Sequence, residues 1–287
     1  ANKRLRSNDA YTAGGEAGFR PDYTVTTYTQ ILKKLFPSTP VLIGGIEASL
    51  RRFTHYDYWQ DRLMKSILVD SKADVLVYGM GEQPITALCK AMQARLQESG
   101  DEHITADVAR EITKDIRQTG YLARKSDVAF DETHDRQLAP HAVCLKEKAK
   151  QAANFLAIEK ESNKVSAKRL MQEYDEGVVV INPPFPTMTT EQLDHSFDLP
   201  YTRLPHPKYN GKRIPAYDMI KHSVNIHRGC FGGCAFCTIS AHQGKFIVNR
   251  SEESIMREIE KIAAMDDFKG YLSDLGGPSA NMYMMKG

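Results

Sequence analysis

The sequence predicts an α/β protein in which a doubly wound parallel sheet is followed by the beginning of a second strand–helix unit. Over the N-terminal third, short apolar runs that end in glycine alternate with amphipathic segments, as buried parallel strands alternate with helices. Near the C-terminus, another apolar run leads into a cysteine- and glycine-rich loop, a helical pattern and a further apolar run. We therefore place an α/β domain at residues 1–199, a linker at 200–220 and a second domain at 221–287.

The first part of the α/β domain shows a clear alternation of helices and strands. Pro37 ends the first helical pattern. Ligands of doubly wound sheets bind at the carboxyl ends of the strands, so Gly79 and Glu82, at the end of the second strand, are candidate ligand-contacting residues. The elements expected are helices over 24–36 and 83–97 and strands over 40–45 and 73–79.

The middle of the chain has a less regular pattern. Two charged segments show helical periodicity, and three short apolar runs are typical of strands. Four prolines between residues 200 and 215 remove backbone donors and fix φ, which favours an extended linker there. The elements expected are helices over 107–119 and 145–160 and strands over 120–122, 127–130 and 178–181.

The C-terminal segment is predicted to form one β–loop–α–β unit. A strand over 223–227 leads into a loop over 229–237. Ser251 has a side chain of the type that caps helix N-termini, and isoleucines at helical spacing continue an amphipathic helix behind it. A second strand is expected over 271–275 and ends at two glycines.

The composition is that of a globular protein, with 287 residues of which 41% are hydrophobic and 26% charged. The net charge of +2 gives no electrostatic basis for a nucleic-acid or membrane partner. No apolar run approaches the roughly 20 residues that a membrane-spanning helix needs. Three of the five cysteines are clustered, which favours metal ligation in a reducing compartment over a disulfide framework, so we expect a cytoplasmic protein.

The clustered cysteines fall within eight residues, in the spacing Cys230-x3-Cys234-x2-Cys237. A loop this short cannot give three thiolates separate partners, so they are expected to bind one metal centre. Three protein ligands leave one coordination position open, where a substrate or cofactor can bind. Two adjacent glycines in the loop would let backbone N–H groups approach the centre and tune it.

Two other interpretations of these cysteines stay open. A zinc-stabilised binding protein would take its fourth ligand from His227 or His242, although structural zinc sites usually pair ligands across a dozen or more residues. A [4Fe–4S] electron-transfer or redox-sensing module would need a fourth cysteine, and Cys89 and Cys144 are remote in the sequence. Those two cysteines are expected to be buried or half-buried structural residues.

With Phe236 before the third cysteine and a strand before the loop, the motif resembles the cluster loop of radical S-adenosylmethionine (radical SAM) enzymes. The resemblance implies that Cys230, Cys234 and Cys237 hold three irons of a [4Fe–4S] cluster and that S-adenosylmethionine chelates the fourth. One-electron reduction would cleave S-adenosylmethionine to a 5′-deoxyadenosyl radical that acts on an unknown substrate. The resemblance also implies an electron donor similar to flavodoxin or ferredoxin, and a partial (β/α) radical SAM barrel as the second domain.

The same resemblance assigns roles to residues near the cysteines. Phe236 is expected to pack near the adenine of S-adenosylmethionine. At the end of the second barrel strand, family members carry a Gly-Gly-Glu-like motif that contacts the methionine amino group. This sequence has Gly276 and Gly277 but then a proline, so close backbone approach is retained while the glutamate is missing. Asp274 and Ser279 are the candidates to replace that carboxylate.

Three longer runs are similar to the YgiQ-type radical SAM proteins, an uncharacterised group. That group joins an N-terminal α/β domain to a radical SAM domain, so the resemblance implies that this chain is part of a longer protein. The runs cover residues 4–15, 44–52 and 277–283.

The α/β domain also resembles the cobalamin-binding domains of other radical SAM enzymes. Histidine-ligated cobalamin requires an Asp-x-His-x-x-Gly motif that follows a strand. The nearest match, Asp101-x-His103-x-x-Ala106, has alanine in place of the glycine and follows a predicted helix. Cobalamin bound without such a histidine stays as an alternative that the sequence does not favour.

Several other residues have both a structural and a functional interpretation. Arg51 and Arg52 could bind a phosphate or carboxylate, or could lie on a solvated helix face. His227 is expected to make a structural hydrogen bond beside the cysteine loop. An aromatic cluster is expected to belong to the core and not to a substrate-stacking site. This cluster consists of His55, Tyr56, Tyr58 and Trp59.

Overall fold

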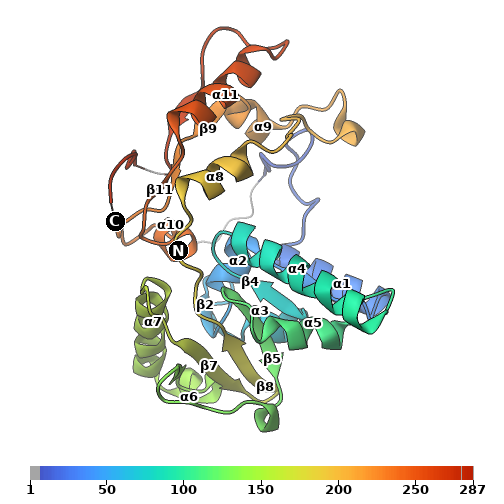
Figure 1. Cartoon of the computed structure of the whole chain (residues 1–287), viewed down its shortest axis with the longest axis vertical. Helices are drawn as coiled ribbons and strands as arrows, with labels where there is room; N and C mark the ends of the chain where they lie inside the picture. Colours follow the sequence, from blue (N-terminus) through green and yellow to red (C-terminus); the bar gives the residue numbers. More distant parts are fainter. Residues whose placement is uncertain (1–6, 279, 287) are drawn as a thin grey trace. The chain divides into compact units, whose positions relative to one another are not determined.

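The computed structural model describes residues 7–278 and 280–286, so residues 4–6 of the first YgiQ-like run and the candidate Ser279 lie outside the described part. The chain forms two compact units, and Figure 1 labels many of their elements. The sheet unit consists of Tyr23–Pro186 with Ala241–Gly244. The cysteine unit consists of Ala1–Asp22, Thr187–Ser240 and Lys245–Gly287.

The sheet unit is built on a six-stranded mixed sheet with the strand order β1-β4-β5-β8-β7-β6. The two outer pairings, β1 with β4 and β6 with β7, are parallel. The three central pairings are antiparallel. The strands are β1 (Leu42–Ile43), β4 (Val75–Val77), β5 (Thr119–Ala123), β6 (Asp135–Gln137), β7 (Arg169–Tyr174) and β8 (Gly177–Ile181).

The α/β class is therefore confirmed, but the predicted doubly wound parallel sheet is wrong in its strand directions. The departure is clearest in the hairpin of β7 and β8, where Tyr174 pairs with Gly177. So short a connection permits only antiparallel pairing, since parallel strands need a crossover of a dozen or more residues. Gly177 has a φ of 150°, and a Cβ there would lie 2.3 Å from the carbonyl oxygen of Ala123 on β5. Glycine is thus required where β8 begins.

Helices cover both faces of the sheet at β4. Leu76 packs in a core with residues of α2, α3 and α7, whereas Val75 and Val77 pack with Leu88 of α4 and Ala109 of α5. Alternate strand residues point to opposite faces, so β4 is buried on both, as expected of an α/β fold. The helices are α1 (Thr24–Leu35), α2 (Gly45–Leu50), α3 (Ile67–Ser71), α4 (Glu82–Ser99), α5 (Ala106–Thr113), η1 (Lys125–Asp127), α6 (His141–Lys146) and α7 (Lys148–Ser162).

The middle of the chain departs most from the predicted elements. The helix expected over 107–119 ends at Thr113, because the Asn182 side-chain amide donates to the carbonyl oxygens of Thr113 and Ile116 at 2.8 Å each. The helix expected over 145–160 is divided into α6 and α7 at Glu147. No strand forms over 127–130, where η1 ends and irregular backbone follows.

The cysteine unit contains the predicted β–loop–α–β arrangement. Strands β9 (Ser223–Asn225) and β12 (Asp274–Gly276) pair in parallel, and α11 (Glu252–Ala263) lies between them in the sequence. Helix α11 begins at the predicted cap, where the Ser251 hydroxyl accepts a hydrogen bond from the backbone N–H of Ser254 at 3.1 Å. Two parallel strands do not make a barrel, so the partial barrel stays a prediction.

A small apolar core joins the strand and helix of this unit. Val224 and Ile226 pack against Ile255 and Ile262 of α11, and Ile262 is fully buried. The isoleucine spacing read from the sequence therefore lies on the buried face of the helix. The remaining elements of the chain are α8 (Thr190–Phe197), η2 (Pro207–Tyr209), α9 (Pro215–Ile220), β10 (His227–Arg228), α10 (Ile239–Gln243) and β11 (Val248–Asn249).

The described part of the first YgiQ-like run also belongs to the cysteine unit. The backbone N–H of Gly14 donates to the carbonyl of Arg213 at 2.7 Å, and the N–H of Ala216 donates to the carbonyl of Ala10 at 2.8 Å. The N-terminal segment is thereby attached to α9 and the residues before it. Within residues 7–278 and 280–286, none of the helices combines the length and apolar character needed to span a bilayer.

Candidate functional site: the cysteine loop

The cysteine loop leaves the short antiparallel pair of β10 and β11. Gly229, directly after β10, has a φ of 88°, and a Cβ at this position would lie 2.1 Å from the carbonyl oxygen of Phe246. No other residue type fits so close an approach between two backbone segments. The exit direction of the loop is therefore fixed by the glycine that precedes the first cysteine.

The three cysteines differ in exposure. Cys230 is buried, with 7% of its surface exposed, Cys237 is intermediate and Cys234 is exposed. The backbone N–H of Cys237 donates to the carbonyl of Cys234 at 3.0 Å, which closes a tight turn between these two residues. The loop thus runs outward from a buried first cysteine to an exposed turn.

Gly232 leaves open a space between two of the sulfur atoms. A Cβ on Gly232 would lie 3.5 Å from Sγ of Cys230, 3.8 Å from Sγ of Cys234 and 3.7 Å from Cε of Met282. Both sulfurs therefore face the glycine, and the absence of a side chain keeps the region between them free.

The donor set fits an iron–sulfur cluster, since three thiolates are the ligands that iron–sulfur clusters prefer. Their arrangement is not yet that of a metal site. In the described part of the chain, no group of three or more His, Cys, Asp or Glu side chains is close enough together to hold a metal ion. The structure brings Cys230 and Cys234 to the same glycine and leaves Cys237 outside this pair.

His227 is the buried support of the loop. It is fully buried, and its Nε2 accepts a hydrogen bond from the backbone N–H of Met282 at 2.9 Å, which confirms the predicted structural hydrogen bond. Its Nδ1 is buried and has no hydrogen-bond partner among the described residues. Burial lowers the pKa of His227, so the imidazole is neutral at neutral pH.

The two candidate glycines at the end of β12 have different surroundings. A Cβ on Gly277 would lie 1.9 Å from Nε2 of His227, so the imidazole occupies the space that any side chain would need. A Cβ on Gly276 would meet only the Asp274 carboxylate, at 3.5 Å. The close approach seen at Gly277 is thus to His227.

The other predicted cofactor contacts stay predictions. Phe236 is 90% exposed, so its ring is free of packing in this structure. Asp274, a candidate to replace the missing glutamate, is exposed at the start of β12. The proposed adenine and amino-group contacts are therefore neither supported nor opposed by these positions.

Arg250 is the residue of this unit that the sequence did not indicate. Its side chain is fully buried, and its guanidinium lies 4.2 Å from the ring centroid of Phe197 on α8. Nη1 donates to the carbonyl of Asn225 at 2.9 Å and to the carboxylate of Glu258, and Nη2 donates to the carbonyl of Ser254 at 2.8 Å. Arg250 therefore ties the end of β9 to α8 and α11. An arginine in a polar stretch carries no sequence signal of such burial.

The alternative fourth ligands for zinc have other partners. Nε2 of His227 accepts a hydrogen bond from Met282, as described above, and Nδ1 of His242 lies 2.9 Å from the hydroxyl of Ser49 within the sheet unit.

His103, the histidine of the incomplete cobalamin motif, is exposed in the segment between α4 and α5. It therefore follows a helix, as the sequence predicted, and not a strand.

Two structural expectations for the sheet unit are corrected. Arg52 is buried and donates to the hydroxyl of Ser162 at 2.8 Å, with its guanidinium 4.9 Å from the ring centroid of Tyr78, so it lies on no solvated face. The predicted core cluster is largely at the surface, because the short hairpin of β2 (His55–Asp57) and β3 (Arg62–Met64) presents it outward. Its exposed members are Tyr56 (57%), Tyr58 (56%) and Trp59 (54%).

The remaining candidates have mixed outcomes. Gly79 has a φ of 69°, and its N–H donates to the hydroxyl of Ser49 at 2.9 Å, so its observed role is to close a turn after β4. Glu82 is half-buried at the start of α4. Cys144 is fully buried, as expected, whereas Cys89 is exposed on α4.

Comparison with known families matches residues 1–223 to the model described as radical SAM N-terminal. The chain therefore belongs to the radical SAM N-terminal family. The cysteine loop lies beyond the matched residues.

The relatives of the chain are the proteins named UPF0313. The chain is 62% identical over 287 residues to the UPF0313 protein of Bacteroides thetaiotaomicron, covering 100% of this chain and 46% of that relative. It is 57% identical over 287 residues to that of Porphyromonas gingivalis, covering 100% and 43%. It is 40% identical over 327 residues to the UPF0313 protein YgiQ of Shigella flexneri, covering 100% and 44%. The predicted membership of a YgiQ-type radical SAM group is confirmed.

The chain spans less than half the length of these curated relatives, and the matched regions include the cysteine loop. No solved structure matches the chain.

Proposed function

We propose that the chain is the cluster-binding part of an iron–sulfur enzyme of the radical SAM type. The observation that carries the proposal is the cysteine loop of a family member, in which Cys230 and Cys234 face the space left by Gly232. A zinc site would need a fourth ligand, and Nε2 of His227 and Nδ1 of His242 are engaged elsewhere, which leaves the buried Nδ1 of His227 as the remaining nitrogen of that ring. Iron–sulfur ligation by three thiolates leaves the open position that such chemistry uses.

Cys230, Cys234 and Cys237 would hold the cluster. A cluster held there would supply one-electron reduction of S-adenosylmethionine, the chemistry by which radical SAM enzymes generate a 5′-deoxyadenosyl radical. To bind a cluster through three thiolates, the loop would have to bring Cys237 close to Cys230 and Cys234. Cys230 is buried directly after Gly229, so we expect any rearrangement of the loop to fall on the more exposed turn between Cys234 and Cys237.

His227 and Arg250 support the loop, and neither is expected to change its charge near neutral pH. His227 accepts a hydrogen bond from the backbone N–H of Met282, and its lowered pKa keeps it neutral, so the imidazole itself adds no positive charge beside the thiolates. Arg250 fixes the end of β9, from which the loop starts. Burial and nearby hydrogen bonds of this kind set the reduction potential of an iron–sulfur centre.

The finer assignments belong to the same proposal. Phe236 would contact the adenine, and the backbone at Gly276 and Gly277 would approach the methionine moiety. An electron donor of the flavodoxin or ferredoxin kind would supply the electron, in the cytoplasm, where thiols stay reduced.

The test has two stages. Anaerobic reconstitution of this chain should give about four irons per chain and a thiolate-to-iron charge-transfer absorption. Replacement of Cys230, Cys234 or Cys237 by serine should abolish it, while Cys89→Ser, an exposed cysteine on α4, should leave it unchanged. A colourless protein that holds one zinc would overturn the proposal.

The second stage uses the longer relative of Bacteroides thetaiotaomicron, which is 62% identical to this chain. Its reduced cluster should change its electron paramagnetic resonance spectrum on addition of S-adenosylmethionine and release 5′-deoxyadenosine with dithionite. A cluster that forms but gives neither result would indicate an electron-transfer or redox-sensing module instead.

A further inference from the structure

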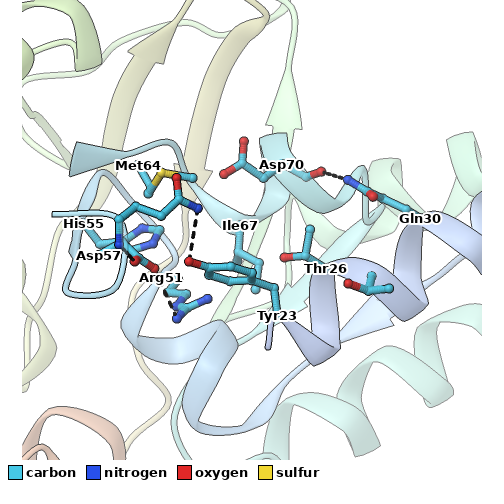
Figure 2. Close-up of a pocket in the computed structure, with 11 residues that line it drawn as sticks. Tyr23, Thr26, Gln30, Arg51, His55, Asp57, Met64, Ile67 and Asp70 are labelled. Atoms are coloured by element: carbon cyan, nitrogen blue, oxygen red, sulfur yellow. Dashed lines mark hydrogen bonds and ion pairs between the residues drawn. The ribbon is translucent and has the colours of Figure 1, made fainter. Parts of the chain in front are cut away.

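A cavity with a volume of about 280 Å³ lies in the sheet unit, and all the residues that line it belong to that unit. It is enclosed by the start of α1, the end of α2, the β2–β3 hairpin and α3 (Figure 2). Its volume lies just below the roughly 300–1,000 Å³ typical of small-molecule sites. The cavity is therefore of a size for a compact metabolite.

The single arginine of the cavity wall already has its charge balanced. Nη1 of Arg51 lies 3.1 Å from Oε1 of Glu47, and Nη2 lies 3.7 Å from Oδ2 of Asp57. The guanidinium also lies 5.1 Å from the ring centroid of Tyr23. Two carboxylates and an aromatic face surround one cation, so Arg51 is a poor anchor for an additional anion.

Asp57 is a buried carboxylate that pairs with Arg51 through Oδ2. Only 3% of the residue is exposed, and Oδ1 accepts the backbone N–H of Gln60 at 2.8 Å. Oδ2 has no hydrogen-bond partner among the residues that the structure describes. Burial raises the pKa of Asp57, but hydrogen bonds from Gln60, Tyr23 and Trp59 and the charge of Arg51 give a net lowering, so the group is ionised at neutral pH.

A second carboxylate borders the cavity from α3. The backbone carbonyl of Asp70 accepts a hydrogen bond from Nε2 of Gln30 at 2.7 Å, and Figure 2 shows its carboxyl group on the side away from Gln30. No ion pair to this carboxylate is formed within residues 7–278 and 280–286. Burial is the main cause that raises the pKa of Asp70, and the charges of Lys65 and Arg62 oppose it without reversing the shift.

His55 adds an acceptor and no positive charge. Its Nδ1 lies 3.1 Å from the carbonyl oxygen of Phe53 and so carries the proton that it donates, which leaves Nε2 as an acceptor. Burial is the main cause that lowers the pKa of His55 to about 4. Met64 and Ile67 supply apolar wall beside these polar groups.

We propose that this cavity binds a compact organic cation, a protonated amine or amidinium on a small apolar body. The carboxylates of Asp57 and Asp70 would accept its N–H groups, and the ring of Tyr23 with Met64 and Ile67 would cover its apolar part. Acidic groups outnumber the single balanced arginine, so a cation is favoured over an anion of the same shape. The site is independent of the cysteine loop, and its test needs no cluster.

The probe series is benzamidine, benzamide and benzoate, which share a shape and differ in charge. Ligand-observed NMR should show benzamidine binding with a Kd of about 1 mM and at least about tenfold more tightly than the other two. The chain has one tryptophan, Trp59, in the turn between β2 and β3, so its fluorescence gives a second readout near the cavity. Equal or tighter binding of benzoate, or no binding of benzamidine, would overturn the proposal.

Variants then locate the site. Asp70→Asn should weaken benzamidine binding by about threefold to tenfold, since it removes one charge and keeps the shape. Asp101→Asn, at an exposed position in the segment between α4 and α5, is the matched control and should bind as the parent does. Asp57→Asn should weaken binding further. If this buried substitution prevents folding, Asp70→Asn alone decides, and binding unaffected by it would contradict the assignment.

Discussion

The imidazole of His227 occupies the position that a side chain at residue 277 would need, with Nε2 only 1.9 Å from a Cβ built on Gly277. The same Nε2 accepts the backbone N–H of Met282 at 2.9 Å. The end of β12, the strand that precedes the cysteine loop and the segment at Met282 therefore meet at one buried ring. The glycine that resembles a cofactor-binding position is required here by a contact within the protein.

Gly277→Ala should destabilise the protein, because the new methyl group cannot coexist with the imidazole without a shift of β10 or β12. Overpacking of this kind costs about 1–3 kcal/mol. Gly276→Ala is the matched control, since its Cβ would meet only the Asp274 carboxylate at 3.5 Å, an ordinary contact. Urea unfolding of both variants measures the difference, and equal losses would contradict the assigned role of His227.

Arg250→Met should cost about 3 kcal/mol of unfolding free energy, because it leaves Oε2 of Glu258 and the Asn225 carbonyl without their buried donor, while Arg203 still pairs with Oε1. Arg257→Gln on α11 is the control. Arg257 pairs with Asp198 at 49% side-chain exposure, so its loss should have a much smaller effect on the unfolding free energy. Chemical denaturation of both variants measures the two losses of unfolding free energy. Equal losses for Arg257→Gln and Arg250→Met would contradict this ranking.

His55→Gln should flatten the pH dependence of stability between about pH 7 and pH 5. The folded-state pKa is lowered to about 4 from 6.5, mainly by burial, so the unfolded chain takes up the proton first as the pH falls. The stability contributed by the neutral ring is complete above pH 6.5 and is lost progressively toward pH 4, by about 2 kcal/mol at pH 5.

The measurement is urea unfolding of the parent and of His55→Gln at both pH values. His103→Gln, an exposed histidine outside the cavity, is the control and should keep the parent's pH dependence. A parent and His55→Gln that lose the same stability on acidification would show that His55 is not the titrating group.

Thiol labelling of the cluster-free protein should rank the cysteines by exposure. Cys234 and Cys89 should react with iodoacetamide fastest, and Cys144 and Cys230, with 0% and 7% exposure, slowest. After reconstitution with iron and sulfide, Cys230, Cys234 and Cys237 should be protected while Cys89 stays reactive. Peptide mass spectrometry reads each site separately. Protection that spares any of the three loop cysteines would remove it from the ligand set.

The local features of the cysteine unit could be predicted because each depends on short-range chemistry. The cap at Ser251 and the apolar spacing along α11 are readable from neighbouring residues, and the structure confirms both. The parallel pairing of β9 with β12 follows from the helix between them. The family of the protein was also readable from its motifs, and the comparisons confirm it.

The sheet directions and the role of Arg250 could not be predicted, because they depend on partners distant in sequence. Strand β7 carries Arg169, Gln172 and Glu173, so it lacks the apolar run that marks a buried strand. Gln172 can be buried because its side-chain amide donates to the carbonyl of Ala139 and its Oε1 accepts the backbone N–H of Thr54. Such satisfied polar groups have no signature in the local pattern.

Glu258 bridges two arginines that come from different parts of the cysteine unit. Arg250 reaches it from the segment after β11, and Arg203 reaches it while donating to the carbonyls of Lys221 and Ser223 at 2.9 Å each. One carboxylate on α11 is thus connected, through the two arginines, to the first and the last residue of β9. A displacement of this helix would be transmitted to the strand that leads into the cysteine loop, and the two arginines would respond together and not one at a time.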